Sequence, residues 1–363
     1  MMTFIIGFIA GVIISIALAV LFFQKKKLHS EVATLKEQIK DLQIYFDGIP
    51  SVPKEKRKGI VIEGLRAEGE KAMDKYRWSE AIDYFEMALA LATGAYRAKV
   101  LARIGRCYYD MGNLDQALTN LKDSLQQARK VQDREGQAAD LVNIGVIHQT
   151  KGELDQALKY LEEALEIHKE VGGRQGEGVI LNNIGMIYDA WGKYDQAIEY
   201  LKKSLKIREE VGDRQGEGVT LNNIGMIYKA RSKYDQAIEY YRKSLKIFED
   251  IKDRKNKGVT LNNIGMIYKT RSEYDQAIEY YKESLKITEE VGDRQGEGAT
   301  LNNIGEVYYA FGKHNQAIEY CKKSLKIFEE IGMSQQIGIV KRNIERISQQ
   351  IKQMKNGKDQ AKA

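Results

Sequence analysis

Proline, cysteine and histidine are scarce in this chain of 363 residues, which contains two prolines, two cysteines and four histidines. Both prolines, Pro50 and Pro53, fall in one short stretch, so the rest of the chain lacks the strongest helix breaker. Cys107 and Cys321 lie far apart, and neither has a neighbouring cysteine with which to form a C-x-x-C metal site. We therefore expect two free thiols in a reducing compartment.

Enzyme signatures are also lacking. The sequence contains no glycine-rich phosphate loop after a strand, no G-x-S-x-G and no H-E-x-x-H. The glycine-rich GDRQGEG lies between two helical segments, and the histidines show no metal-ligand spacing. A net charge of +6 is too mild for a nucleic-acid-binding surface. We expect a protein that is not an enzyme and that needs no cofactor, metal or nucleic acid.

The chain instead repeats itself every 40 residues from Ala98 onward, almost verbatim beyond residue 174. The segment RQGEGVTLNNIGMIYKARSKYDQAIEYYRKSLKI (214–247) has near copies on both sides. A period of this length indicates a stack of supersecondary units, none of which can bury its apolar face alone. Stacked repeats create long surfaces and not enclosed pockets, which also favours binding over catalysis.

Each repeat is predicted to contain two helices, and we number its positions from Gly218 as position 1. A first apolar set recurs at steps of three and four residues: Leu221, Ile224, Gly225, Ile227 and Tyr228. A second set follows the polar segment RSKYDQ: Ala237, Ile238, Tyr241, Leu245 and Ile247. Gly225 and Ala237 are small where the two helices cross, so a larger side chain at either is expected to cost about 1–3 kcal/mol.

The pattern of a small residue at position 8, an aromatic at 11, alanine at 20, a large apolar residue at 24 and a small one at 27 resembles the tetratricopeptide repeat. Position 8 is occupied by Gly69, Gly105, Gly145, Gly185, Gly225, Gly265 and Gly305, and position 20 by Ala81, Ala117, Ala157, Ala197, Ala237, Ala277 and Ala317. Ala72 and His148 depart from the aromatic at position 11, and serine stands at position 27 in most repeats. The 40-residue length is similar to the repeats of kinesin light chains and the LGN family of adaptors. The resemblance implies an all-α, right-handed superhelical solenoid.

Seven repeats are predicted within residues 60–333, at 62–95, 98–131, 138–171, 178–211, 218–251, 258–291 and 298–331. A capping helix with a polar outer face is expected at 334–354, followed by a disordered tail at 355–363. Before the repeats, the prolines mark 48–59 as a basic linker. Its lysines could touch anionic lipid headgroups or simply be solvated.

The N-terminus predicts a membrane anchor. Thr3 to Phe23 carries no charge over 21 residues, about 31 Å as a helix. No basic region precedes it, which favours a retained transmembrane helix (1–24) over a cleaved signal peptide. The lysines at 25–27 favour the cytoplasmic side. We expect a single-pass protein of the cell membrane whose repeats lie in the cytoplasm.

The same region indicates pairing of two chains. Small residues recur at four-residue steps in the apolar segment: Gly7, Gly11, Ser15 and Ala19. A short coiled coil (25–47) is predicted from a heptad seam: Leu28, Val32, Leu35, Ile39, Leu42 and Phe46. Such small residues are also common in membrane helices, and the seam could dock on the first repeat, so a homodimer is one of two interpretations.

The resemblance implies that positions 2, 5, 6, 9, 12 and 13 line a concave groove. Asparagine, a poor helix-interior residue, recurs there: Asn143, Asn182, Asn183, Asn222, Asn223, Asn262, Asn263, Asn302 and Asn303. An amide both donates and accepts hydrogen bonds, so this series could hold an extended peptide backbone; recent duplication would also produce it. At the variable position 12, Lys229 and Lys269 would favour an acidic segment or a C-terminal carboxylate.

These patterns predict a membrane-anchored scaffold or adaptor that binds extended segments of partner proteins, with pairing adding avidity. One alternative is a regulatory subunit that presents substrates to a membrane enzyme or protease. Another is an exported solenoid, which requires the opposite topology.

Overall fold

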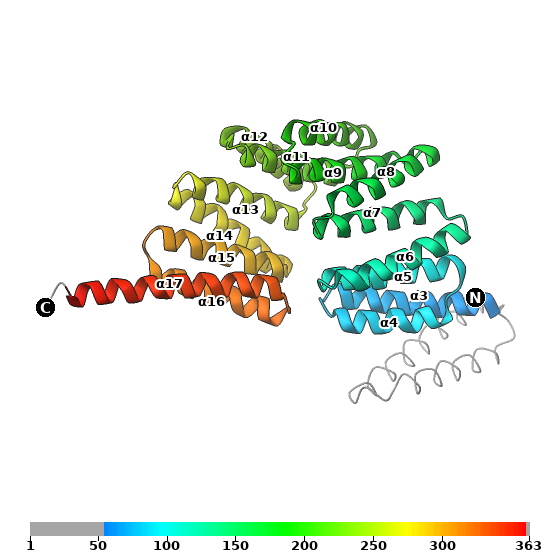
Figure 1. Ribbon diagram of the computed structural model, residues 1–363, viewed down its shortest axis with the longest axis horizontal. Coiled ribbons are helices and arrows are strands. Elements are labelled where there is room, and N and C mark those ends of the chain that lie inside the picture. The colour runs from blue at the N-terminus through cyan, green and yellow to red at the C-terminus, as the bar shows by residue number, and fades with distance from the viewer. Residues whose placement is uncertain (1–53, 361–363) are drawn as a thin grey trace, which may run out of the picture. The chain divides into compact units, whose positions relative to one another are not determined.

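All regular secondary structure in residues 54–360, the part described by a computed structural model, is helical (Figure 1). The helices are α3 (Lys54–Met73), α4 (Trp78–Leu91), α5 (Gly94–Asp110), α6 (Leu114–Lys130), α7 (Arg134–Thr150), α8 (Leu154–Val171), α9 (Arg174–Ala190), α10 (Tyr194–Val211), α11 (Arg214–Ala230), α12 (Tyr234–Asp250), α13 (Arg254–Thr270), α14 (Tyr274–Val291), α15 (Arg294–Ala310), α16 (His314–Glu330) and α17 (Ser334–Gln360). The predicted all-α class and two helices per repeat are confirmed.

Several predictions fall outside these residues, namely the membrane anchor (1–24), the coiled coil (25–47), the start of the linker (48–53) and the last three residues of the tail (361–363). Within 54–360, none of the helices combines the length and apolar character needed to cross a bilayer.

Both ends of the helical region extend further than the sequence predicted. Helix α3 begins at Lys54, directly after Pro53, so residues 54–59 of the predicted linker are helical. Lysine, glutamate and arginine are good helix formers and no proline follows, which accounts for the early start. Helix α17 likewise continues to Gln360, past the expected end of the capping helix at 354, in a stretch without proline.

The helices form two compact units that divide after Ile147. In the first unit α3 packs on α4, α4 on α5 and α5 on α6. In the second, each helix from α8 to α17 packs on the next. The first helices of its repeats, α9, α11, α13 and α15, also contact one another in order, and α17 contacts α15 as the next first helix would. We call the surface shared by α9, α11, α13, α15 and α17 the first-helix face.

The turns between repeats are built by helix caps. In α11 the Asp213 carboxylate accepts a hydrogen bond from the backbone N–H of Gly216, and Asp293 does the same for Gly296 in α15. The preceding helix α10 ends at Val211 and is followed by Gly212, whose φ of 70° is a conformation that glycine adopts without strain. Only Gly212 and Asp213 of the GDRQGEG segment form the turn between the two helices, and RQGEG, which was predicted to lie in the turn, is the start of α11.

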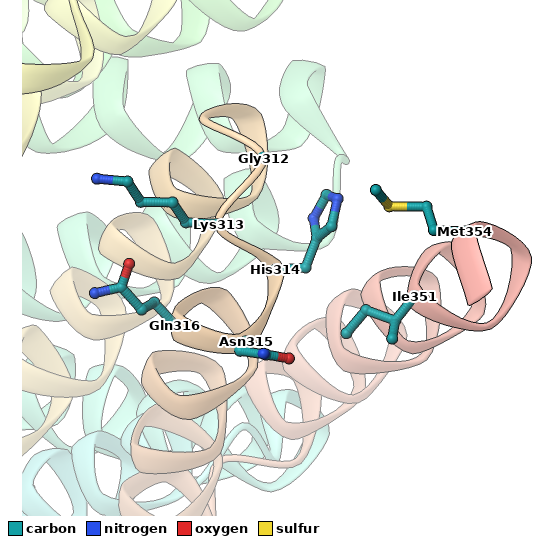
Figure 2. Close-up of a pocket in the computed structure, with 7 residues that line it drawn as sticks. All are labelled: Gly312, Lys313, His314, Asn315, Gln316, Ile351 and Met354. Carbon is teal, nitrogen blue, oxygen red and sulfur yellow. The ribbon is translucent and has the colours of Figure 1, made fainter. Parts of the chain in front are cut away.

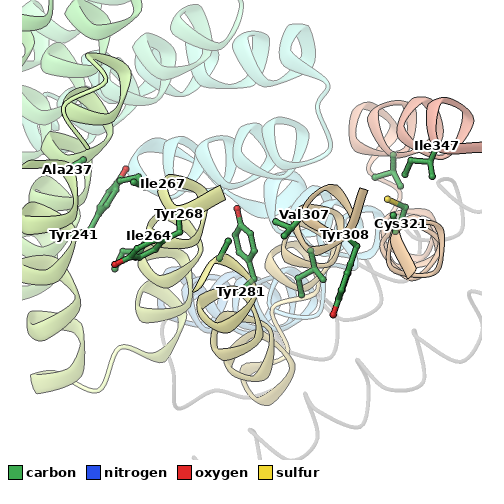
Figure 3. Packing of buried hydrophobic residues seen from close by; sticks show 14 of the residues in the cluster. Ala237, Tyr241, Ile264, Ile267, Tyr268, Tyr281, Val307, Tyr308, Cys321 and Ile347 are labelled. Carbon is green, nitrogen blue, oxygen red and sulfur yellow. The ribbon is translucent and has the colours of Figure 1, made fainter. Parts of the chain in front are cut away.

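Close helix crossing explains the glycine at position 8. In the cluster of Figure 3, Tyr241 from α12 is fully buried against α11, and Ala237 beside it has no exposed surface. A Cβ added to Gly225 would lie 2.7 Å from the Tyr241 ring, closer than van der Waals contact permits. Cys321 of α16 fills the place of Tyr241 in the last repeat, and a Cβ on Gly305 would lie 2.7 Å from its Sγ.

Serine at position 27 departs from the tetratricopeptide pattern because it makes a buried hydrogen bond. Ser244 donates to the carbonyl oxygen of Gly218 at 2.8 Å, tying the second helix of a repeat to the first. Its hydroxyl also lies 3.5 Å from Thr260 Oγ1 in the next repeat. Ser204, Ser284 and Ser324 make the same bond to the position-1 carbonyl of their own repeats.

His148 at position 11 keeps the packing of the aromatic that it replaces. Its ring stacks on Tyr160 with centroids 5.2 Å apart, as Tyr188 stacks on Tyr200 in the next repeat. The predicted free thiols are confirmed, and both cysteines are buried. Burial raises the pKa of Cys107 to about 12 and that of Cys321 to about 11, so neither is a reactive thiolate near neutral pH.

Candidate functional site

The structure gathers eight of the nine predicted asparagines on the first-helix face of the second unit, at positions 5 and 6 of α9, α11, α13 and α15. Asn182 and Asn222 are nearly buried, with 7% and 9% of their surfaces exposed, and the others are half-buried. The ninth, Asn143, is half-buried on α7 in the first unit and is therefore considered apart.

The asparagines hydrogen-bond to one another across repeats. In each link, the Nδ2 group at position 6 donates to the Oδ1 atom at position 5 of the preceding repeat, 41 residues earlier. The links are Asn223 to Asn182 (2.9 Å), Asn263 to Asn222 (3.2 Å), Asn303 to Asn262 (2.9 Å) and Asn343 to Asn302 (3.0 Å). We call this series the asparagine ladder. Its first role is structural, since it fixes the spacing of successive first helices.

The links use only part of the hydrogen-bonding capacity of the asparagine ladder. Each link uses one N–H at position 6 and the carbonyl oxygen at position 5, which leaves the position-5 amide group and the position-6 carbonyl oxygen. The Nδ2 group of Asn182 donates a hydrogen bond to Oδ1 of Asn183 at 3.5 Å. The corresponding groups of Asn222 and Asn262 meet no hydrogen-bond partner among residues 54–360. In α15 the amide group of Asn302 donates to Glu306. The free amide donors and carbonyl acceptors therefore lie in α11 and α13.

Apolar side chains accompany these polar groups. Position 2 lies one helical turn before position 5 on the same face. Val179 and Val259, which occupy position 2, are 36% and 39% exposed. Met226 and Met266 at position 9 are half-buried. Exposed valine, hydrogen-bonding amide and pliable thioether therefore recur along the face, a combination suited to an extended polypeptide.

The two predicted lysines differ in their surroundings. Lys269 forms an ion pair with Glu306 of the following repeat. Lys229 donates to the Met266 thioether at 2.8 Å, and no carboxylate of the described residues lies within ion-pair distance of it. Half-burial, and then the nearby charge of Lys269, lower the pKa of Lys229. Asp189, at the same position of α9, is half-buried, and burial raises the pKa of its carboxyl.

Sequence reasoning missed two members of the face, Asn343 and Glu306. Asn343 lies in the predicted capping helix, yet it stands 40 residues after Asn303 and extends the ladder. The 40-residue register carried past Glu330 would have found it. Glu306 replaces methionine at position 9, and its carboxylate accepts from Asn343 at 3.1 Å as well as pairing with Lys269.

Away from this face, a cavity of about 460 Å³ lies between the start of α16 and the end of α17. Figure 2 shows Ile351 and Met354 of α17 beside His314 at its edge. Among the residues whose side chains the structure describes, its lining combines one lysine and one histidine with amides and apolar groups. In residues 54–360, no three His, Cys, Asp or Glu side chains are grouped so as to hold a metal ion.

Solved structures with similar folds have low sequence identity to this chain. A Rap protein complexed with Competence and Sporulation Factor is 15% identical, with 89% of this chain and 94% of that chain covered and a TM-score of 0.61. The Rap conjugation gene regulator of the plasmid pLS20, in complex with the Phr* peptide, is 16% identical, with 86% and 93% covered and a TM-score of 0.59. A putative kinesin light chain from Podosopora anserina, with nearly identical TPR-like repeats, is 15% identical over 53% of this chain and 96% of that chain, with a TM-score of 0.44.

No curated protein sequence matches the chain significantly. The profile of the tetratricopeptide repeat matches five overlapping segments, at residues 96–170, 137–210, 177–250, 216–290 and 256–330. These segments together cover residues 96–330, well over half of the 363 residues. The chain therefore belongs to the tetratricopeptide repeat family.

Proposed function

We propose that this protein is an interaction scaffold whose first-helix face binds an extended segment of a partner protein. The observation that carries the proposal is the set of asparagine donors and acceptors in α11 and α13 that the ladder leaves without a partner among residues 54–360. In α11 and α13 the amide groups of Asn222 and Asn262 meet no hydrogen-bond partner among residues 54–360, and they lie beside the carbonyl oxygens of Asn223 and Asn263. An extended backbone presents one donor and one acceptor about every 3.3 Å, whereas packed helices lie about 8–10 Å apart, so roughly one guest residue in three could bond to these amides. The function proposed is binding and not catalysis.

The exposed valines would supply the apolar part of the contact. Val179 and Val259 lie on the same helix faces as the asparagines. Burial of each valine side chain by a guest is worth about 1–1.5 kcal/mol, and the loss of one such contact weakens binding by about tenfold. The two Rap proteins of similar fold were solved with a peptide or a factor bound, which supports the proposal by analogy.

The proposal is tested by selecting, from a displayed library of random decapeptides, those that bind the full-length chain. Val259→Glu should lower the affinity for the selected peptides by about tenfold or more, because a charge replaces an apolar contact. Val291→Glu is the matched control, since Val291 has a similar exposure of 41% but lies at the end of a second helix, α14. Equal loss in both variants, or a selection that yields no peptide, would contradict the proposal.

The proposal places this scaffold at a membrane through residues 3–23, with the repeats in the cytoplasm. The support is the uncharged 21-residue run followed by three lysines. A reporter enzyme active only in the cytoplasm, fused after Ala363, should be active and should sediment with membranes. Substitution of Leu21 and Phe22 by aspartate should release the fusion, whereas Leu28 and Val32 provide a control pair outside the apolar run. A soluble wild-type fusion would refute the anchor.

A further inference from the structure

A second contact between repeats accompanies the asparagine ladder and joins position 12 to position 9 of the following repeat, 37 residues later. In this contact Lys229 reaches Met266, and Lys269 reaches Glu306. In the last repeat the guanidinium of Arg346 lies over the ring of Tyr309, 4.8 Å from its centroid. The register of the stack therefore brings these two positions together, whatever residues occupy them.

The Lys269 contact is complete within the protein. One oxygen of Glu306 pairs with the Lys269 ammonium, and the other accepts hydrogen bonds from Asn302 at 3.4 Å and Asn343 at 3.1 Å. Both carboxylate oxygens are thus satisfied. Lys269 already has a counter-charge within the protein, so a guest carboxylate gains less there than at Lys229, and the predicted binding role of Lys269 stays a prediction.

The Lys229 contact is incomplete. Methionine stands where Glu306 stands one repeat later, and a thioether is only a weak acceptor for an ammonium group. Lys229 is half-buried, so its charge has lost part of its hydration without gaining a counter-charge from the described residues. A carboxylate brought to the Lys229 ammonium group would supply the counter-charge that Glu306 supplies to Lys269.

We propose that Lys229 exchanges its contact with the Met266 thioether for the carboxylate of an aspartate or glutamate side chain in the bound segment, as Lys269 pairs with Glu306. This inference rests on the proposed binding of an extended segment. A side chain is favoured over a chain terminus because the asparagine ladder continues on both sides of Lys229, through Asn182 and Asn223 before it and Asn222 and Asn263 after it. The guest is therefore expected to run past Lys229 and not to end there.

Met266→Glu tests the inference because it supplies the missing carboxylate within the protein, as Glu306 does for Lys269. Peptides selected on the full-length wild-type chain should share an acidic residue at one aligned position. Exchange of that residue for its amide should weaken binding to the wild type by about tenfold, the effect expected of one charge-assisted hydrogen bond. Met266→Glu should bind the acidic and amide peptides equally and should unfold at a higher temperature than the wild type.

Two further variants serve as controls for this test. Lys229→Met removes the charge and should abolish the preference for the acidic peptide while leaving the amide peptide bound. Glu306→Met should free Lys269 and create a preference for a second acidic residue. If the wild type binds acidic and amide peptides equally, or if Lys229→Met keeps the preference, the inference is wrong. In that case, if Val259→Glu still weakens the binding of the selected peptides, the proposed function stands. A selection that yields no peptide would overturn both the inference and the proposed function.

Discussion

Gly225→Ala is expected to lower the free energy of unfolding by about 1–3 kcal/mol, although alanine is the better helix former. The added Cβ would lie 2.7 Å from the ring of Tyr241, which is fully buried in a cluster with Ile264 and Ile267 of α13. The two helices of the repeat must then separate. Urea unfolding followed by circular dichroism measures the change.

Gly338→Ala is the matched control for Gly225→Ala. Gly338 also lies within a helix, α17, but a Cβ there would come no nearer than 3.7 Å to another group, the Arg342 guanidinium. Helix propensity then acts alone, and the variant should be as stable as the wild type or up to about 1 kcal/mol more stable. If both alanine variants gain stability, close crossing at position 8 does not limit the packing.

Asp140→Thr is expected to stabilise the first unit above neutral pH, by about 1–4 kcal/mol. Asp140 is buried at position 3, where α11, α13 and α15 carry threonine. The Ser124 hydroxyl lies 2.8 Å from the Ala98 carbonyl oxygen and 2.6 Å from Asp140 Oδ2, yet it has one proton to donate. A protonated Asp140 can donate to Ser124, which then donates to Ala98. Burial accordingly raises the pKa of Asp140 from 3.8 to about 7, despite the bond from Ser124.

The sign of the pH dependence follows from that shift. Between pH 4 and 7 the folded chain keeps a proton on Asp140 that the unfolded chain has lost, so stability falls as the pH rises through this window. Below it the penalty is absent, and above it the penalty is complete. Thermal unfolding at pH 5 and pH 8 should differ less in Asp140→Thr, and in the isosteric Asp140→Asn, than in the wild type. An unchanged difference in both variants would show that Asp140 is ionised without cost.

The sequence alone predicted the fold closely because the period is exact. Positions 8 and 20 marked the helix crossings, and GDRQGEG marked the connection between repeats, where Gly212 and Asp213 form the turn. The limits of α3 and α17 were misjudged, since helix formers continue beyond the repeat pattern in 54–59 and 355–360.

The candidate site was only partly predictable from sequence. The asparagines were identified, but their bonds to one another depend on a 41-residue register between neighbouring helices, which no single repeat reveals. Likewise, Lys229 and Lys269 are identical in sequence context up to position 12, and only the 37-residue contact shows that one meets Met266 and the other Glu306. Interactions between repeats, unlike those within one, require the stack to be known.

Site-specific photocrosslinking tests the central claim most directly. A photoreactive amino acid is placed in the full-length chain at Val259 on the first-helix face or at Val291 on a second helix, two sites with nearly equal exposure. A selected peptide should crosslink at 259 and not at 291, and an excess of the unlabelled peptide should suppress the product. Crosslinking at 291 alone would place the guest on the second helices and would contradict the proposal that the asparagine ladder binds it.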